Sequence, residues 1–492
     1  MLLRILRYAA ISLAIVGLTA AILYQFFGLR VVLLGGGRPT LAFVTSAEAQ
    51  ANAIEQHRAA QAAETPAVAV PTAVEQPSLA AAPEEAATTT GATTTPAAAA
   101  TSDWPFFRGP RWDGHYTAQP VNLDWQSLPN RELKPVWKQP VGGGYASFVT
   151  APIAAIDAAF TIEQRGRQEV VAAYDVATGR ELWTNTWEAE FREFMGGDGP
   201  RATPTWFDNV VFAQGATGEL RAINASTGAT LWRTNILTDA GATNIQWGMS
   251  GSPLIVDDLV VTMPGGSRGK AFIAYDRRTG NQRWSAHNDR AGYSSPMLVT
   301  IDGVRQILTV TATRIVGLDP TDGSLLWEHP WVTMYDVNAG QPLLIGNNRV
   351  FMSSGYDHGA VVIEITMGDG RGSVKEIWQN NRMKNQFTSS VLHDGFIYGL
   401  DESILACVDA ATGTLKWKGG RYGYGQVALV DGHLIVLTED GDMALVRATP
   451  DKHEELTRFP VLDGKTWNHP AFSHGRLLVR NLSEMAMFDL RR

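Results

Sequence analysis

Residues 173–183 read AYDVATGRELW, and this eleven-residue pattern returns four more times along the chain. The other copies are AINASTGATLW (222–232), AYDRRTGNQRW (274–284), GLDPTDGSLLW (317–327) and CVDAATGTLKW (407–417). Each copy places an Asp or Asn at its third position and a Gly at its seventh. Asp and Asn accept hydrogen bonds from amides two or three residues further on, and Gly supplies the positive φ of a tight turn. The pattern therefore predicts repeated β-hairpins, each followed by a Trp on the next strand.

The tryptophans at the ends of these copies set a period. Short apolar runs punctuated by Gly, Asp, Asn and Pro fill the intervals, without a convincing amphipathic helix, which favours strands. About four short strands in each period of 40–50 residues is typical of a propeller blade. We therefore predict an all-β fold, an eight-bladed β-propeller of four-stranded antiparallel blades. The repeating aromatic positions are Trp137, Trp183, Trp232, Trp284, Trp327, Trp378, Trp417 and a degenerate Phe459.

The two ends of residues 102–492 complete each other. The last segment has three strand-like runs and stops at Met487-Phe488-Asp489, which match the first three positions of the repeat without its Trp. Near the other end, Leu133–Trp137 is a lone strand with a Trp and no preceding hairpin. We expect the two fragments to share one blade, because closing the ring removes the open sheet edges.

Residues 1–34 are predicted to form an N-terminal transmembrane anchor. Residues 8–29 carry no charge, and a helix of that length spans about 33 Å, enough for a bilayer core of about 30 Å. Arg4 and Arg7 favour a cytoplasmic N-terminus. A cleaved signal peptide is the alternative, although its apolar core is usually about 7–15 residues. We predict a single-pass membrane protein with its propeller in the periplasm or outside the cell.

Residues 46–101 are rich in Ala, Pro, Thr and Glu and contain no aromatic residue. Such a composition cannot bury enough apolar surface to offset chain entropy, so we predict a flexible linker. An Ala-rich helix within residues 47–63 is the local alternative. The domain organisation is therefore an anchor (1–34), a linker (46–101) and a propeller (102–492).

Composition excludes several classes of function. The net charge is −8, which disfavours a general nucleic-acid binder. The single cysteine, Cys407, excludes an intramolecular disulfide and a cysteine-ligated zinc or iron–sulfur site.

The eleven-residue pattern resembles the tryptophan-docking motif of the pyrroloquinoline-quinone (PQQ) repeat family. WPFFRGPRWDG (104–114) is similar to the opening signature of bacterial PQQ-like repeat proteins. The resemblance covers about residues 102–492 and implies the eight-bladed propeller. The family includes quinoprotein alcohol dehydrogenases, and it also includes non-enzymatic members similar to the outer-membrane assembly lipoprotein BamB. The repeats are structural in both groups and do not choose between them.

The resemblance to the dehydrogenases implies PQQ held beneath a disulfide of two adjacent cysteines, with Ca²⁺ on a Glu/Asn/Asp set. One cysteine cannot form that disulfide, and no motif matches the calcium ligands residue by residue. We therefore predict a protein without catalytic residues, cofactor or metal. A PQQ-dependent quinoprotein-like oxidoreductase is the alternative.

The connections between blades converge at one mouth of a propeller channel, and here they are rich in aromatic residues, Arg and Asn, as binding sites are. We expect a binding or scaffolding module for a protein partner in the cell envelope, with a role in envelope assembly. A sensor for a small anionic ligand is the second alternative, since the mouth would be locally cationic. Alternatively, the polar side chains of these loops only form hydrogen bonds with the amides and carbonyls of the loop backbone. The candidate residues are Arg201, Trp247, Arg290, Tyr293, Arg382, Lys384, Arg421, Tyr422, Tyr424, Lys465 and Trp467.

Overall fold

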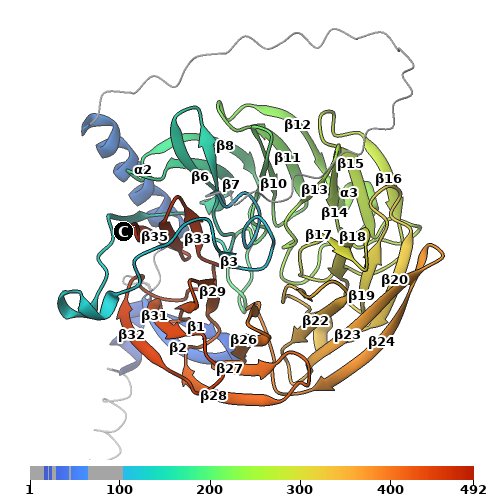
Figure 1. Ribbon diagram of the computed structural model, residues 1–492. Coiled ribbons are helices and arrows are strands. Elements are labelled where there is room, and N and C mark those ends of the chain that lie inside the picture. Colours follow the sequence, from blue (N-terminus) through green and yellow to red (C-terminus); the bar gives the residue numbers. More distant parts are fainter. Residues whose placement is uncertain (1–15, 20, 25–28, 44–45, 65–102) are drawn as a thin grey trace, which may run out of the picture.

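The computed structural model describes residues 16–19, 21–24, 29–43, 46–64 and 103–492. In this part of the chain eight antiparallel sheets stand around a common channel, so the predicted eight-bladed propeller is confirmed (Figure 1). Each blade runs from an inner strand beside the channel to an outer strand at the rim. Apolar residues of neighbouring blades pack face to face and form the core.

The first four blades follow one another in the chain. They are β5 (Val149–Ile153), β6 (Ile156–Arg165), β7 (Gln168–Asp175) and β8 (Glu181–Glu188); β9 (Thr205–Phe207), β10 (Val210–Gln214), β11 (Glu219–Asn224) and β12 (Thr230–Asn235); β13 (Leu254–Val256), β14 (Leu259–Thr262), β15 (Phe272–Asp276) and β16 (Gln282–Ala286); and β17 (Met297–Ile301), β18 (Val304–Val310), β19 (Arg314–Leu318) and β20 (Leu325–Pro330).

The next three blades continue the ring, and the third of them gains a parallel fifth strand, β3 (His115–Tyr116). They are β21 (Leu343–Ile345), β22 (Arg349–Ser354), β23 (Gly359–Gly368) and β24 (Arg371–Asn380); β25 (Val391–His393), β26 (Phe396–Asp401), β27 (Ile404–Asp409) and β28 (Leu415–Arg421); and β29 (Gln426–Val430), β30 (His433–Leu437), β31 (Asp442–Arg447) and β32 (Glu455–Pro460).

The eighth blade is shared between the two ends of the propeller, as predicted. It consists of β33 (Ala471–Ser473), β34 (Arg476–Arg480), β35 (Glu484–Asp489) and, from the other end, β4 (Trp137–Pro140). Trp137 lies opposite Met487, and Pro140 lies opposite Glu484. The outer strand was expected over Leu133–Trp137, and this boundary is wrong. Pro135 has no N–H to donate to the sheet, so pairing begins after it. The first bond runs from the Val136 N–H to the Met487 carbonyl.

Each of the five copies of the repeated motif joins its blade to the preceding one. Its Asp or Asn side chain accepts the predicted turn hydrogen bonds, and its Gly has a positive φ. The Gly lies against the Trp of the preceding blade: a Cβ at Gly228 would be 2.8 Å from the Trp183 ring. Within the described residues, six indole Nε1–H groups also donate to a carbonyl of the following blade. These bonds run from Trp137 to Val176, Trp183 to Ala225, Trp232 to Arg277, Trp284 to Pro320, Trp378 to Ala410, and Trp417 to Thr449.

Trp327 departs from this pattern, and the following blade has no copy of the motif. Strands β23 and β24 instead form a long hairpin that turns at Gly368–Arg371. The Trp327 indole donates within its own blade, to the Gln306 side chain, and packs beside Gly372 of β24.

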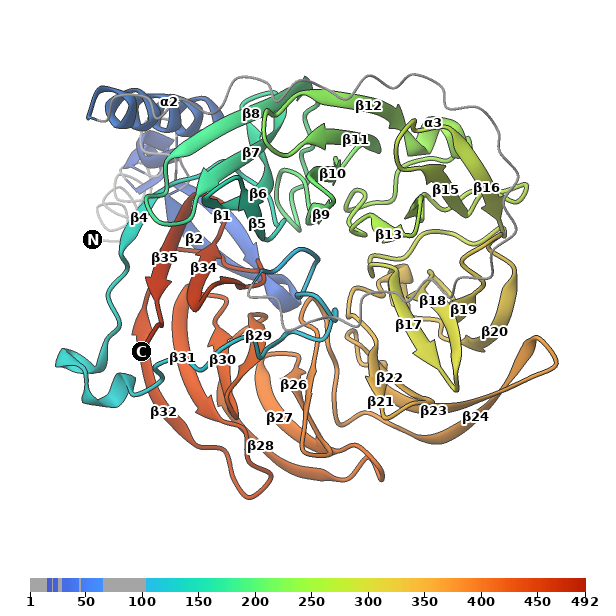
Figure 2. The same cartoon turned by 45° about the horizontal axis from the view of Figure 1, so that its top comes forward.

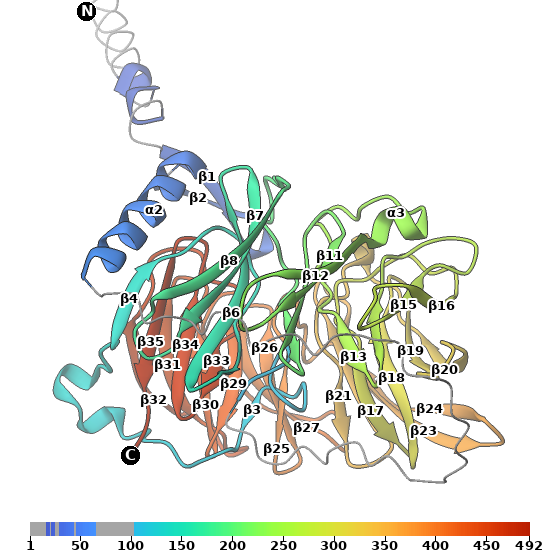
Figure 3. The ribbon, with the colours of Figure 1, turned by 90° about the horizontal axis from the view of Figure 1, so that it is seen from above.

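Residues 103–116 run across the channel (Figures 1 and 2). Trp104 is buried, and β3 extends the blade of β29 on the side away from the N-terminal hairpin (Figure 3). The buried Arg108 guanidinium donates through Nη2 to the carbonyls of Ser390 (2.6 Å) and Asp113 (2.9 Å). Burial lowers the pKa of Arg108 to about 10. Phe107 of the same segment lines the pocket of the channel.

Two N-terminal elements lie on the mouth side of the ring. Strands β1 (Leu29–Leu34) and β2 (Arg38–Phe43) form a hairpin around Gly35–Gly37, and α2 (Ala47–Glu64) lies along β4 (Figures 2 and 3). Ile54 of α2 is fully buried, and Gln50 donates to the carbonyls of Val141 (2.9 Å) and Leu482 (2.6 Å). Over Ala47–Glu64 the helix alternative is thus found in place of a flexible linker; residues 65–101 lie outside the described residues.

Most of the predicted anchor over 8–29 also lies outside the described residues. Of that segment, residues 16–19 and 21–24 are helical and Leu29 begins β1. No helix among the described residues is long and apolar enough to cross a membrane. The strand over Leu29–Leu34 replaces the end of the anchor expected over 1–34.

Candidate binding site at the channel mouth

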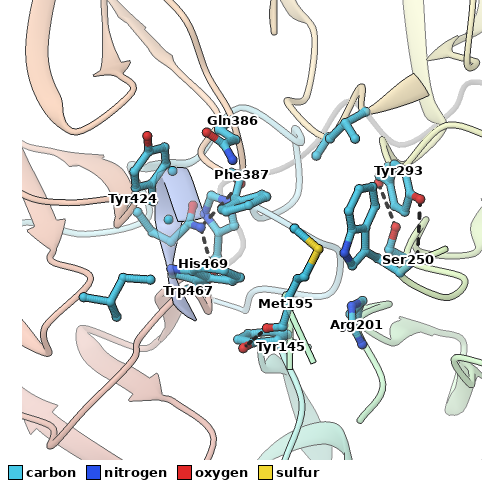
Figure 4. Close-up of a pocket in the computed structure, with 18 of the residues that line it drawn as sticks. Tyr145, Met195, Arg201, Ser250, Tyr293, Gln386, Phe387, Tyr424, Trp467 and His469 are labelled. Atoms are coloured by element: carbon cyan, nitrogen blue, oxygen red, sulfur yellow. Dashed lines mark hydrogen bonds between the residues drawn. The ribbon is translucent and has the colours of Figure 1, made fainter. Parts of the chain in front are cut away.

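The mouth holds a pocket of about 360 Å³ that interblade loops line with aromatic side chains (Figure 4). One wall carries Phe387, Tyr424 and Trp467, from the loops that precede β25, β29 and β33. The facing wall carries Trp247 and Tyr293, from the loops that precede β13 and β17. Loops from distant parts of the chain therefore build one apolar slot between two aromatic walls.

The first wall is held rigidly. The Phe387 and Trp467 ring centroids are 4.4 Å apart, and Tyr424 lies 6.0 Å from Phe387. The Trp467 indole Nε1–H donates to Glu439 Oε1 at 2.9 Å. Glu439 is itself buried, so its carboxylate fixes the indole from within the protein.

The two cations at the mouth are engaged with protein groups. Arg201 donates through Nη2 to the Gly197 carbonyl (2.6 Å) and so organises the loop that carries Met195. Lys465 Nζ donates to the Gly196 carbonyl at 2.9 Å and lies 4.0 Å from the Trp467 ring centroid. Burial lowers the pKa of Lys465 to about 8. These bonds use part of the donor capacity of each cation, and the nearby carboxylates of Glu193 and Asp198 offset the positive charge, which weakens the expectation of a cationic mouth.

The floor of the pocket is apolar with a few polar atoms. Phe107 meets His469 edge to face at 5.0 Å. Burial, with Arg108 nearby, lowers the pKa of His469 well below its usual value, so the imidazole is neutral at pH 7. His469 Nε2 and the Ser252 hydroxyl, both in buried residues of the lining, have no hydrogen-bond partner in the described part of the chain.

The tip of the N-terminal hairpin reaches into this mouth. The Gly35 N–H donates to Glu439 Oε1 at 2.6 Å, and the Leu33 carbonyl accepts from Lys465 Nζ at 3.2 Å. Residues Leu33–Gly37 therefore form part of the pocket lining beside Tyr424.

Six of the eleven predicted site residues meet at the pocket. Arg201, Trp247, Tyr293, Tyr424 and Trp467 line it, and Lys465 lies at its edge.

The other five predicted residues lie elsewhere. Arg290 pairs with Asp336, Arg421 donates to the Ser403 hydroxyl, and Arg382 is exposed outside the pocket lining. Lys384 pairs with Asp401. Tyr422 is buried between blades, where its hydroxyl donates to Glu455 at 2.6 Å. These five residues do not line the pocket, because a loop's position at the mouth does not fix the direction of each side chain.

Several residues of the site were not predicted. They are Phe107, Tyr145, Met195, Tyr356, Phe387, Glu439 and His469, together with Gly35–Gly37. Phe387 and Met195 belong to the same interblade connections as the predicted residues Lys384 and Arg201, and their aromatic or apolar character was a usable signal. The triple glycine belonged to no repeat, and only the tertiary contact reveals its role.

The residues present do not fit a PQQ–calcium site. Cys407 is buried within β27, away from the pocket lining. Over the described ranges, no group of three or more His, Cys, Asp or Glu side chains could hold a metal ion. The donor set therefore does not match what the dehydrogenases would require.

Comparisons with known proteins agree with the fold and narrow the family. A family model described as outer membrane protein assembly factor BamB matches residues 167–419. The outer membrane protein assembly factor BamB of Yersinia pestis is 24% identical over 306 residues, which cover 57% of this chain and 74% of that protein.

Two solved structures share the fold. BamB from Moraxella catarrhalis has a TM-score of 0.51 at 16% identity, covering 73% of this chain and 100% of that chain. Quinohemoprotein alcohol dehydrogenase from Comamonas testosteroni has a TM-score of 0.56 at 13% identity, covering 80% and 81%.

The fold and the repeats define an eight-bladed β-propeller of the PQQ-repeat class, with an aromatic pocket at the channel mouth. Within that class, the chain belongs to the family described as outer membrane protein assembly factor BamB.

Proposed function

We propose that this protein is a membrane-associated, extracytoplasmic propeller that binds protein partners of the cell envelope through its channel mouth. Membership of the BamB family is the observation that carries the proposal, since its relatives are named as assembly factors of outer membrane proteins. The aromatic slot supplies a surface suited to peptide side chains.

The contacts at the mouth favour a protein partner over the two alternatives. Arg201 and Lys465 are bonded to main-chain carbonyls and lie beside the carboxylates of Glu193 and Asp198, which disfavours a small-anion sensor. The missing donor set disfavours PQQ chemistry. Exposed Phe194, Met195, Met334 and Tyr335 add apolar contact area beyond what a monomer uses for its own core.

Site-specific photo-crosslinking tests the binding surface. A photoreactive phenylalanine analogue replaces Met195, which lines the pocket and is half exposed, in the full chain inside a diderm bacterium. The control carries the analogue at Arg371, exposed in the hairpin of β23 and β24 at the rim. We expect adducts with envelope proteins from position 195 and not from 371. Adducts from the rim alone would contradict the proposal.

A topology reporter tests the location. A reporter that is active only outside the cytoplasm, fused after Arg492, is expected to be active with the full chain. Activity of a cytoplasm-only reporter at the same position would contradict an extracytoplasmic propeller.

A further inference from the structure

The hairpin tip is held at the mouth through its backbone. The Gly35 amide donates to Glu439, and the Leu33 carbonyl accepts from Lys465. The side chains that make these bonds, Glu439 and Lys465, are charged and largely buried, so the bonds are strong and directional. Because main-chain atoms make the contacts, the mouth recognises the shape of a turn more than the identity of its side chains.

The mouth also selects glycine. A Cβ on Gly35 would lie 2.0 Å from the Tyr424 ring, and a Cβ on Gly36 would lie 2.7 Å from the Tyr424 hydroxyl. Gly35 is buried there, while Gly36 and Gly37 have φ near +70°. The ring therefore accepts only a turn whose first residue has no side chain.

The rest of the hairpin is weakly supported. Strands β1 and β2 pair only with each other among the described strands. Val31 and Leu41 are half or more exposed. An isolated two-stranded sheet is marginally stable in water, so the tip contact can be exchanged for an equivalent one.

We propose that the mouth is a binding site for a glycine-containing β-turn of another polypeptide, and that Gly35–Gly37 is its built-in competitor. The tip occupies the site until a partner's turn displaces it. A tethered segment competes at a local concentration in the millimolar range, which raises the affinity that a partner needs. This inference rests on the proposed function in taking the mouth as the partner-binding surface.

Peptide binding to the full chain tests the inference. The probe is residues 29–43 with a cysteine added at each end and closed as a disulfide, which favours the hairpin; the Leu29–Phe43 pair shows that these ends are adjacent. In the full chain, Gly35→Val should expel the tethered tip from the mouth, because the valine side chain would collide with the Tyr424 ring. We expect it to bind the probe at least about tenfold more tightly than the unaltered chain does.

Three controls make the result specific. Gly368→Val, at a glycine without neighbours within 4 Å, should bind the probe as weakly as the unaltered chain. Glu439→Gln added to Gly35→Val should weaken binding at least about tenfold through loss of the charge-assisted bond. A probe carrying Gly35→Val should not bind. Gly35→Ala is a milder second variant if Gly35→Val fails to fold.

Equal probe binding by the unaltered chain and Gly35→Val would overturn the inference. Binding of the Val-containing probe as tightly as the glycine probe would do so as well. The crosslinking at position 195 is independent of this assay. Crosslinks without probe binding would support the proposed function and contradict the turn-binding site. Probe binding without crosslinks would support the turn-binding site and contradict the mouth as a surface for envelope partners.

Discussion

The outer rim and the channel mouth are built by the same blades but stabilised in different ways. At the rim, one contact is repeated: a Trp of one blade covers a Gly and donates to a carbonyl of the next, as Trp183 does with Gly228 and Ala225. At the mouth, each loop makes its own contacts, as Trp467 does with Glu439 and Phe387. A short repeated motif therefore encodes the stabilising contacts of the rim, whereas no motif encodes the contacts of the mouth.

Opening the ring should have the largest effect. Deleting residues 484–492 removes β35 and leaves β34 and β4 without a partner between them. We expect an insoluble product, because the exposed sheet edges and residues such as Leu477 and Leu478 of β34, which are buried in the intact blade, drive association. Deleting only Arg491 and Arg492, which are exposed, should leave a soluble protein. Solubility after expression is the measurement, and a soluble, monomeric product of the longer deletion would contradict closure by β4.

Removing one rim tryptophan should have the next largest effect. Trp232 is 8% exposed and donates to the Arg277 carbonyl, so Trp232→Ala should lower the free energy of unfolding by about 3–5 kcal/mol. Trp247→Ala at the mouth is the matched control, since its half-buried ring lines a pocket with room beside it. Denaturant unfolding compares the two. Equal losses would remove the distinction between rim and mouth.

Two turn glycines separate backbone strain from packing against a tryptophan. Gly228 and Gly303 have φ of 73° and 81°, but only Gly228 faces a tryptophan, while nothing lies within 4 Å of a Cβ at Gly303. Gly303→Ala should cost about 1 kcal/mol from strain alone, and Gly228→Ala about 1–2 kcal/mol or more. Thermal melting of both variants gives the difference. Identical costs would mean that the Trp183 contact adds nothing.

The pH dependence of Lys465 should produce the smallest effect, and it belongs to the mouth. Its pKa in the folded protein is about 8, below the usual 10.5, so the unfolded chain binds more protons between these values. Its contribution to the free energy of unfolding should therefore rise as pH increases from about 8 to about 10.5. Lys465→Met should abolish this rise, whereas Lys375→Met, on an exposed position of β24, should keep it. Unfolding curves across this pH range supply the test, and an unchanged slope in Lys465→Met would contradict the burial of the ammonium group.

The fold could be predicted because its information is local and repeated. The motif ending at Trp183 encodes a turn and a docking residue within eleven positions, and each copy needs only its neighbour. The split blade could be predicted from its missing parts. The boundary at Leu133–Trp137 was wrong because Pro135 blocks pairing, a detail that the repeat does not contain.

The site could be predicted only in part. Loop position and composition indicated Trp247, Tyr424 and Trp467, which do meet at the pocket. The same reasoning also chose Tyr422, which packs between blades and donates to Glu455. Tyr424, two residues further on, faces the pocket. In an irregular loop, side-chain direction depends on what each residue packs against, and residues far away in the chain decide it.

The amino-acid sequence by itself determined the ring: the number of blades, the docking of most blades on the next, and the closure by both ends. Only the tertiary structure decided how the mouth is filled. The hydrogen bond from Gly35 to Glu439 joins positions 404 apart in the chain, and no repeat or motif links them. A periodic contact leaves its period in the sequence, but a contact made once between distant segments leaves no pattern, because it depends on where the folded ring brings those segments together.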